Sequence, residues 1–259
     1  MNKIGFIGYG SMGKMIIKGF MSSNIIEPGE MIISTRNMDK LDELKKIHPK
    51  IEITSNKLLL ADKCSKIILM VNTAELKNVL EEIKPNLSPD THIIYISAGV
   101  TIKELETIFP GKISHVIPSV TGEVSKGVSL ISHSERVDDQ DIIFVDTLFK
   151  SLGQIKTVFE EDMERATVLT SCFPAFITFF CKKFSDEAIR QGTFSQKEVD
   201  YMIKATLDGT SKLLLEIDFD ELISRVATRG GITEAGLQVM DSELSAMFKE
   251  LFQVTIKTA

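Results

Sequence analysis

Apolar residues recur along residues 1–159 at two different spacings, which predicts strands separated by helices. Short apolar runs, typical of buried strands, alternate with segments whose apolar residues repeat at helical spacing. Lys66–Val71 is the strongest strand signal, because its almost unbroken apolar run suits a strand covered on both faces. The other predicted strands are residues 3–7, 31–34, 51–53, 92–96, 113–117, 128–132 and 154–159. This alternation predicts the α/β fold class, with a doubly wound sheet.

The helices expected between these strands begin at residues that can cap free N–H groups. Thr101-Ile102-Lys103-Glu104 has the pattern of a capping box, and Asn72-Thr73-Ala74-Glu75 has a related Asn-x-x-Glu pattern. We therefore expect the Thr101 and Asn72 side chains to cap their helices. The predicted helices are residues 12–21, 37–47, 72–83, one that starts at 101, and one from 138 or 139 to about 150.

From about residue 160 the pattern predicts helices alone, with no convincing strand before the last few residues. The predicted helices are residues 162–191 with an interruption at Pro174, 195–216, 220–227 and 233–252. Their apolar faces are wide, as around Leu213–Leu215 and Leu244–Leu251. About 100 residues in a few helices bury such faces poorly alone. We therefore expect two domains, residues 1–159 and 160–259, and a homodimer formed by the helical one.

The turn between the first strand and the first helix has the glycine spacing of a dinucleotide-binding loop. Gly8 would make the tight turn, Gly10 would let phosphates approach the backbone, and Gly13 would let helix and strand pack closely. The alternative is a glycine-rich turn of some other α/β domain. Its place between a strand and a helix, at the start of the alternating pattern, favours nucleotide binding. The predicted cofactor-binding residues here are Gly8, Tyr9, Gly10, Ser11, Met12 and Gly13.

The end of the second strand indicates which nicotinamide cofactor is preferred. An acidic residue usually binds the adenosine ribose of NAD at this position. Here the chain reads Ser34-Thr35-Arg36-Asn37, with two hydroxyls and a cation and no acid before Asp39. Ser34, Thr35 and Arg36 therefore predict a site for a 2′-phosphate and a preference for NADPH over NADH. The alternative is that Arg36 is an ordinary solvated surface residue.

Composition and charge exclude several other classes of protein. The 259 residues include 30 Lys and Arg against 36 Asp and Glu, a net charge of −6, with no basic block, so we expect no nucleic-acid partner. Cys64, Cys172 and Cys181 form no C-x-x-C pair and predict buried thiols, with neither a disulfide framework nor a metal site. No apolar stretch reaches about 18 residues, and the first strand leaves no room for a signal peptide. We therefore expect a cytoplasmic protein with no membrane partner.

The residue types missing from the helical half favour reduction of a C=N bond over a C=O bond. Reduction of a ketone needs a placed proton donor, commonly His or Lys. The last histidine of the chain is His133 and the last asparagine is Asn86, so the helical half has neither. An imine can already be protonated near neutral pH and needs no strong acid from the enzyme. Four lysines of this half are each followed four residues later by an acid, typical of solvated pairs: Lys182, Lys183, Lys204 and Lys212.

A second glycine turn, Thr228-Arg229-Gly230-Gly231-Ile232-Thr233, precedes the last long helix. Free N–H groups at this helix start could hold a carboxylate, with the Thr233 hydroxyl as a further donor. An ordinary helix cap explains the same residues equally well.

The full chain resembles the pyrroline-5-carboxylate reductases, which reduce a cyclic imino acid to proline with NAD(P)H. The resemblance rests on Ile4–Gly13, on Ser97-Ala98-Gly99-Val100-Thr101-Ile102, on Glu160–Met163 and on Thr228–Thr233. It implies an N-terminal Rossmann domain followed by an all-helical dimerisation domain, with each site completed across the interface of an intertwined homodimer. Rings of dimers also occur in the family.

The resemblance also implies roles for individual residues. In the family the last motif holds the substrate carboxylate, and its threonine, matched by Thr233, lies beside the imine nitrogen as the catalytic residue. The implied substrate-binding residues are Thr228, Arg229, Gly230, Gly231, Ile232 and Thr233. Further implied cofactor-binding residues are Val71, Asn72, Ser97, Ala98 and Gly99.

The chain departs from the family pattern at several of these positions. Asn72 replaces a lysine that lines the cofactor cleft, Phe173 replaces a glycine, and Arg229 replaces the proline of the carboxylate turn. The segment Val116-Ile117-Pro118-Ser119 also differs from the family's Met-x-Asn-like sequence. Two alternative functions follow. One is a reductase of another carboxylated imine, and the other is a nucleotide-binding paralogue with little activity.

Overall fold

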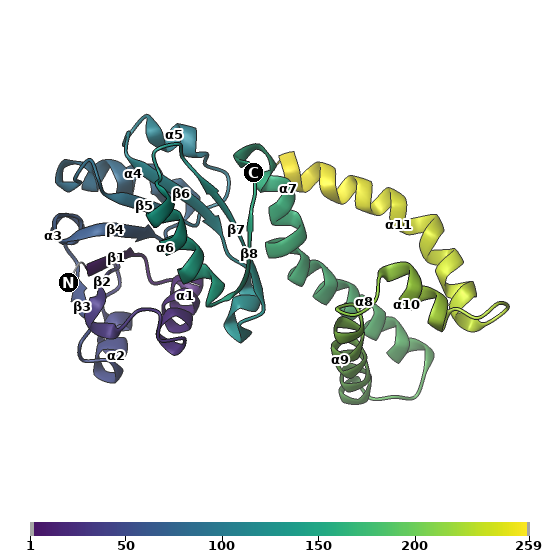
Figure 1. The fold of residues 1–259 in the computed structure, drawn as a ribbon. Helices are drawn as coiled ribbons and strands as arrows, with labels where there is room; N and C mark the ends of the chain where they lie inside the picture. The colour runs from purple at the N-terminus through teal and green to yellow at the C-terminus, as the bar shows by residue number, and fades with distance from the viewer. Residues whose placement is uncertain (1–2, 258–259) are drawn as a thin grey trace. The chain divides into compact units, whose positions relative to one another are not determined.

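The computed structural model describes residues 3–257, which form two compact units that divide between Pro174 and Ala175. The first unit is a Rossmann-type sheet and the second is helical, which confirms the predicted fold class (Figure 1). The predicted division at residue 159/160 lies within the first unit, before the short helix α7 (Met163–Thr167).

The sheet of the first unit has eight strands in the order β3-β2-β1-β4-β5-β6-β7-β8. All neighbouring strands are parallel except β6 and β7. The strands are β1 (Lys3–Ile7), β2 (Met31–Ser34), β3 (Glu52–Thr54), β4 (Cys64–Leu69), β5 (His92–Tyr95), β6 (Lys112–Ile117), β7 (Gly127–His133) and β8 (Gly153–Thr157). Each predicted strand is present; β1 and β2 have the predicted bounds, and those of the other strands differ by one or two residues.

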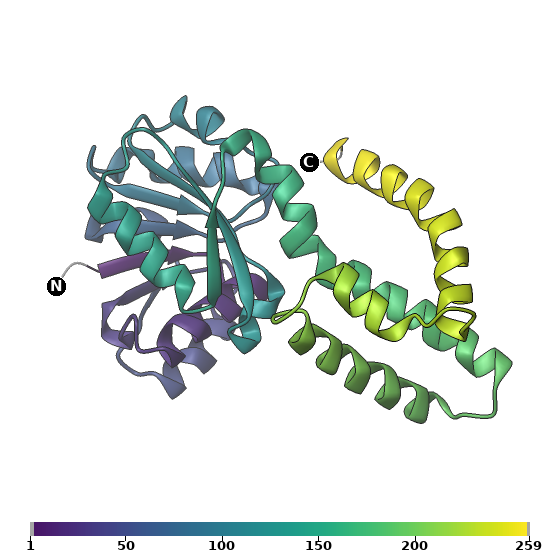
Figure 2. The same cartoon turned by 45° about the vertical axis from the view of Figure 1, so that its right-hand side comes forward.

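Helices cover both faces of the sheet (Figures 1 and 2). Successive strand residues point to opposite faces, so Phe6 of β1 packs in one core cluster and its neighbour Ile7 in another. One cluster includes α1 (Ser11–Ser22), α2 (Asp39–Ile47) and α6 (Asp139–Lys150). The other includes α3 (Lys57–Lys63), α4 (Thr73–Ile83) and α5 (Ile102–Glu106).

The cap of α4 and the presence of α3 differ from the prediction. The Thr101 capping box is present, but Asn72, although it precedes α4, makes no side-chain capping hydrogen bond. Helix α3 was not predicted, and Asn56 caps it by accepting hydrogen bonds from the N–H groups of Leu58 and Leu59 at 3.0 and 3.1 Å. A cap followed by only seven helical residues leaves too short an apolar pattern to identify from sequence.

The interruption predicted at Pro174 is a π-helical segment, Val168–Cys172, between α7 and α8 (Phe173–Gln191). Proline has no N–H to donate to the carbonyl four residues earlier, which here belongs to Thr170. The Ser119 hydroxyl donates to that carbonyl at 3.0 Å. The helical path therefore continues through the proline, and a side chain from another element takes the hydrogen bond.

The helical unit contains most of α8, then α9 (Gln196–Leu213), α10 (Phe219–Val226) and α11 (Ile232–Lys257). The Ser185 hydroxyl of α8 donates to Asp200 of α9 at 3.1 Å, which ties these two helices together. No strand forms among the described residues after 252, because α11 continues to Lys257. Among the described residues from Ala175 onward, only Ser185 and Val199 are buried. This unit therefore lacks a core of its own.

Candidate active site

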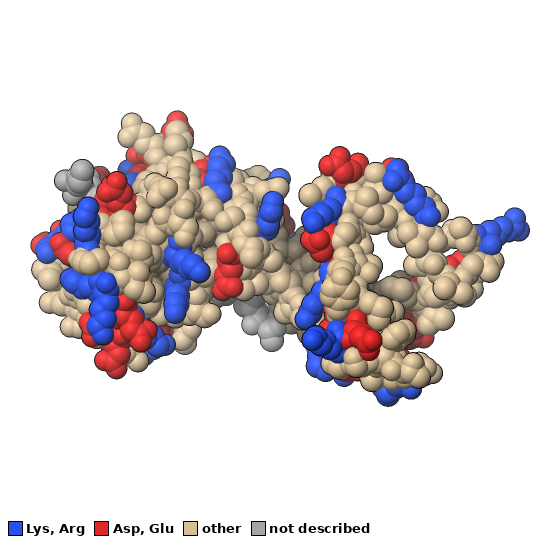
Figure 3. Space-filling view, turned by 90° about the horizontal axis from the view of Figure 1, so that it is seen from below, with Lys and Arg blue, Asp and Glu red and all other residues tan. Residues whose placement is uncertain are grey.

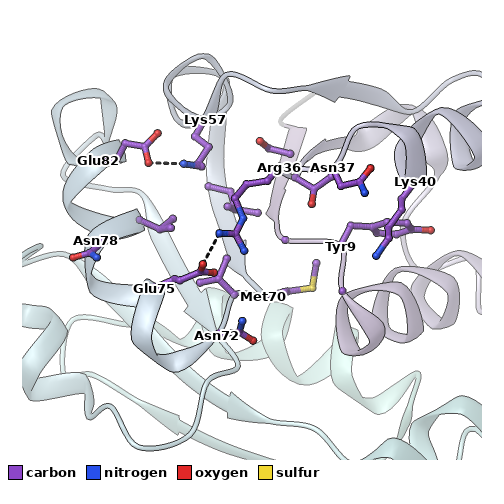
Figure 4. A pocket seen from close by; sticks show the side chains of 17 residues that line it. Tyr9, Arg36, Asn37, Lys40, Lys57, Met70, Asn72, Glu75, Asn78 and Glu82 are labelled. Atoms are coloured by element: carbon purple, nitrogen blue, oxygen red, sulfur yellow. Dashed lines mark hydrogen bonds and ion pairs between the residues drawn. The ribbon is translucent and has the colours of Figure 1, made fainter.

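A cavity of about 460 Å³ lies at the carboxyl ends of β1, β2 and β4 (Figure 4). Strand β1 is the point where the strand order reverses, with β2 on one side and β4 on the other. The helices that follow β1 and β4 pack on opposite faces of the sheet, so their starts separate and leave a crevice. Many predicted cofactor residues line it: Gly8, Tyr9, Gly10, Ser34, Thr35, Arg36, Val71 and Asn72.

The backbone of the glycine turn leaves room for a ligand at one position only. Gly8 has φ +107°, and a Cβ there would lie 2.2 Å from the Met70 carbonyl oxygen, so the turn needs glycine. A Cβ on Gly13 would lie 2.9 Å from the Gly8 carbonyl oxygen. A Cβ on Gly10 would meet nothing within 4 Å. The space beside Gly10 is thus open and faces the cavity.

Helix α1 begins at this opening with free backbone donors. Gly10 precedes the helix and offers no side-chain cap, and the first turn contains no acidic residue. The N–H groups of Ser11, Met12 and Gly13 belong to that turn, and the first helical bond is from Lys14 N–H to the Gly10 carbonyl at 2.9 Å. These donors and the helix dipole suit a pyrophosphate. The residues present therefore fit a dinucleotide.

Charged side chains border the part of the cavity beyond β2. The Arg36 guanidinium contacts the Glu75 carboxylate at 2.6 Å, and Figure 4 shows the two pointing toward each other across the cavity. Lys57 pairs with Glu82. The Arg36 side chain is 79% exposed, so its ion pair contributes at most about 1 kcal/mol.

Sequence reasoning missed several residues that line this part of the cavity: Asn37, Lys40, Lys57, Glu75, Asn78 and Glu82. Lys40 lies four residues after Arg36, in the first turn of α2, and this second nearby cation was an available signal. Lys57 and Glu82 come from α3 and α4, and no local pattern could connect them to the end of β2. Tyr9, which was predicted, has its pKa raised by burial and by the nearby Glu43 carboxylate, so its phenol stays protonated near neutral pH.

The predicted residues Ser97, Ala98 and Gly99 follow β5 and are tied to the end of β4. The Ser97 hydroxyl donates to the Val71 carbonyl at 2.6 Å. The Thr73 hydroxyl donates to the Ala98 carbonyl at 2.8 Å. Gly99 has φ +75°, which lets the chain turn back toward α5. This loop is therefore attached to Val71, which lines the cavity.

The second glycine turn lies in the helical unit, at the start of α11. Gly230 has φ +74°, and the Gly231 N–H donates to the Thr228 carbonyl at 2.9 Å. The Gly230 N–H donates to the Glu234 carboxylate at 2.7 Å. Helix α11 begins at Ile232, one residue before its predicted start at Thr233, so Thr233 lies inside the first turn. The donor considered for a substrate carboxylate thus already binds a carboxylate of this chain.

Phe173, which replaces a family glycine, is 53% exposed at the start of α8. The π-helical segment before it is fixed to the turn after β6, because Ser171 donates to the Pro118 carbonyl at 3.0 Å.

Among residues 3–257 the structure contains no group of three His, Cys, Asp or Glu side chains that could hold a metal ion. No helix formed by the described residues is long and apolar enough to cross a membrane.

Comparisons with known proteins extend this description. A family model for pyrroline-5-carboxylate reductase dimerisation matches residues 160–259, and one for NADP oxidoreductase, coenzyme F420-dependent, matches residues 3–99. The pyrroline-5-carboxylate reductase of Methanobrevibacter smithii is 35% identical over 246 residues, covering 92% of this chain and 96% of that protein. Pyrroline-5-carboxylate reductase 3 of Bacillus subtilis is 31% identical over 260 residues, covering 99% and 95%.

Among solved structures, that of Plasmodium falciparum pyrroline carboxylate reductase with NADP bound is similar, with a TM-score of 0.84 and 26% identity. The match covers 99% of this chain and 95% of that one. A Rossmann sheet with a glycine turn at its crevice, followed by a helical region, defines a nicotinamide-nucleotide-binding oxidoreductase. The chain belongs to the pyrroline-5-carboxylate reductase family.

Proposed function

We propose that the protein reduces 1-pyrroline-5-carboxylate to L-proline and uses NADPH in preference to NADH. The observation that carries this proposal is the cavity at the end of β1. Gly10 lines it with open space beside its Cα, and Arg36 lines the same cavity. The names of its relatives support the substrate. Bound cofactor supplies a hydride from its nicotinamide ring, and the carbon of the C=N bond accepts it.

The residues of the helical unit would hold the substrate. The turn formed by Thr228, Arg229, Gly230, Gly231 and Ile232 would bind the carboxylate, and Thr233 would donate a hydrogen bond to the reacting nitrogen. The bond from Gly230 N–H to Glu234 supports this, because it shows that a carboxylate oxygen fits that donor. The substrate carboxylate would then compete with Glu234. We propose residues 160–259 as the domain that carries this site and the dimer interface.

A test of substrate identity is the oxidation of NADPH with a panel of cyclic imines. We expect turnover with 1-pyrroline-5-carboxylate, and less with imines that lack the carboxylate or have a larger ring. Turnover only with another carboxylated imine would support the divergent reductase. Nucleotide binding without turnover of any imine would support the paralogue. That alternative is kept because Asn72 and Phe173 depart from the family pattern and because a relative at 30% identity is named ComE operon protein 4.

Replacing Arg36 by alanine is expected to weaken NADPH binding about tenfold and NADH binding less than about threefold. A charge-assisted hydrogen bond to the 2′-phosphate is worth about 1.5 to 3 kcal/mol, and the exposure of Arg36 favours the lower value. Isothermal titration with both cofactors measures the two losses. The control is Arg136→Ala, an exposed arginine of the same unit that does not line the cavity. Equal losses for the two cofactors would remove the argument for a 2′-phosphate site.

The helical unit is expected to form a homodimer in solution. Large apolar side chains of α8 and α9 are exposed in the single chain and line a groove of about 440 Å³, among them Phe180, Phe184 and Met202. Light scattering at micromolar concentration should give twice the 28.8 kDa of one chain, or a multiple of that dimer mass if dimers form rings. Leu207→Asp, a charge placed in this groove, should lower the mass. A wild-type mass of one chain would contradict the proposal.

The cytoplasmic location of the protein stays a prediction.

A further inference from the structure

A buried polar cluster lies beside the loop that follows β5, outside the cavity already described. It consists of Tyr95 at the end of β5, His115 in β6, and Glu160 in the short 3₁₀ segment Glu160–Asp162. Tyr95 and His115 are buried and are paired in register, with their rings stacked at 4.2 Å between centroids. All three residues belong to the first unit.

Both ring nitrogens of His115 lie within hydrogen-bond distance of an oxygen atom. Its Nε2 lies 3.1 Å from the Ser97 carbonyl oxygen, which can only accept a hydrogen bond. Its Nδ1 lies 3.0 Å from Glu160 Oε1. Glu160 Oε1 also accepts the Ile102 N–H at 3.0 Å, as a carboxylate does. Both ring nitrogens of His115 therefore face oxygen atoms that accept hydrogen bonds.

The charge of Glu160 agrees with this geometry. Burial raises the pKa of Glu160, but the hydrogen bond and positive charge of His115, with the Ile102 N–H, outweigh it and lower the pKa below its usual value. The pair is partly removed from solvent, because the His115 side chain is 4% exposed and the Glu160 side chain 25% exposed. Such a pair costs desolvation free energy, so a cluster that serves stability alone could be replaced by apolar residues.

The cluster holds both ends of the loop from Ser97 to Ile102. His115 binds the Ser97 carbonyl, the Tyr95 hydroxyl donates to the Val100 carbonyl at 2.8 Å, and Glu160 binds the Ile102 N–H. Ser97 in turn donates to the Val71 carbonyl at the edge of the cavity. His115 and Glu160 thus add to the bonds from Ser97 and Thr73 that hold this loop at the end of β4.

The loop lies on one particular side of the glycine turn. In the sheet, β2 with Arg36 after it is on one side of β1, and β4 and β5 are on the other. A dinucleotide whose pyrophosphate lies at the glycine turn, with its adenosine beyond β2, must place its nicotinamide half toward β4 and β5. The loop after β5 is therefore at the nicotinamide end of the site.

We propose that the His115–Glu160 pair positions the Ser97–Gly99 loop for the nicotinamide half of the cofactor. This rests on the proposed function, because it requires a nicotinamide dinucleotide in the crevice. His115 and Glu160 are positioning residues and act through the backbone of Ser97 and Ile102. Loss of the pair shifts the loop and weakens binding of the nicotinamide half, while the adenosine half is bound as before.

The experiment compares two ligands by isothermal titration: NADPH, and adenosine 2′,5′-bisphosphate, which lacks the nicotinamide half. Glu160→Gln keeps the shape of the side chain and an oxygen that can accept from the Ile102 N–H, but removes the negative charge. His115→Gln leaves a single amide group in place of the two ring nitrogens that face the Ser97 carbonyl and Glu160. In both variants we expect NADPH binding to weaken roughly tenfold, as a small displacement of a positioning group does. The dissociation constant of the bisphosphate should change less than about twofold.

The controls are matched by residue type. Glu161→Gln changes an exposed carboxylate next to Glu160, and His48→Gln changes a histidine outside the cluster. Both should bind the two ligands as the wild type does. A ¹⁵N spectrum of the wild-type imidazoles is simple because the chain has 4 histidines, and it does not depend on the folding of a variant. It should show a proton on the His115 nitrogen that faces Glu160.

Three results would overturn the proposal. Folded variants that bind NADPH as the wild type does would remove the positioning role, and so would an equal loss for both ligands, which indicates general destabilisation. A wild-type His115 without a proton on the nitrogen that faces Glu160 would contradict the hydrogen bond between them. If the wild type binds neither ligand, both the proposed function and the positioning role fail. If the wild type binds NADPH and the variants bind it with the same affinity, only the positioning role fails.

Discussion

Replacing Thr233 by alanine is expected to lower kcat about ten- to thousand-fold and to leave NADPH binding unchanged. As the carbon accepts the hydride, electron density increases on the reacting nitrogen. A hydrogen bond donated to that nitrogen therefore strengthens during the reaction, and its removal lowers kcat. The measurements are steady-state turnover of 1-pyrroline-5-carboxylate and titration with NADPH.

The matched control is Thr255→Ala, a threonine of the same helix whose hydroxyl donates to the Leu251 carbonyl at 2.8 Å. It should keep wild-type turnover. If Thr233→Ala also keeps wild-type turnover, the substrate site has been assigned to the wrong turn.

Replacing Gly10 by alanine is expected to abolish NADPH binding in the range accessible to titration, a loss of more than about a hundredfold, without unfolding the protein. The substituted residue fits the apo chain, because φ is −78° and a Cβ there meets nothing within 4 Å. The same methyl group would occupy the space that a pyrophosphate needs against the backbone. Binding of NADPH and the thermal unfolding midpoint are the two measurements.

Two other glycines serve as references for this result. Gly29→Ala, in the loop before β2, should change neither quantity, because its Cβ would make only an ordinary contact at 3.9 Å with Lys50. Gly8→Ala should instead lower the unfolding midpoint, because its Cβ would collide with the Met70 carbonyl. If Gly10→Ala binds NADPH normally, the phosphates do not lie at this turn.

The strand pattern of the first unit could be predicted because most strands have a local signature. Buried apolar runs such as Lys66–Val71 need no knowledge of distant residues. The capping box at Thr101 could be predicted for the same reason, since its donors and acceptors are three residues apart. Asn72 has the sequence of a cap, but its side chain makes no capping bond, and the residue lines the cavity. The local sequence pattern could not distinguish a side chain that caps a helix from one that lines the cavity.

Features that depend on distant contacts could not be predicted. The π-helical segment before Pro174 needs Ser119, more than fifty residues earlier, to bind the Thr170 carbonyl. The Arg36–Glu75 pair joins the end of β2 to the first turn of α4. His115 and Glu160 carry no motif, and their relation to Ser97 exists only once β5 and β6 are side by side. The sequence thus indicated the cofactor turn but not the groups that border or support it.

The surface charge agrees with a small-molecule substrate as the expected partner. On the face seen in Figure 3, basic and acidic side chains are mixed, and no extended basic surface is visible. The net charge of −6 would also repel a polyanion at long range. A nicotinamide dinucleotide is itself anionic, so its binding depends on local donors such as the first turn of α1 and on Arg36.

The most direct test of the account is to follow the hydride itself. The protein is incubated with 1-pyrroline-5-carboxylate and NADPH that carries deuterium at both C4 positions of the nicotinamide ring, and the product is analysed by mass spectrometry and NMR. We expect L-proline with one deuterium, located at ring carbon C5, where the C=N bond was reduced. Absence of proline, or proline without deuterium at C5, would contradict it.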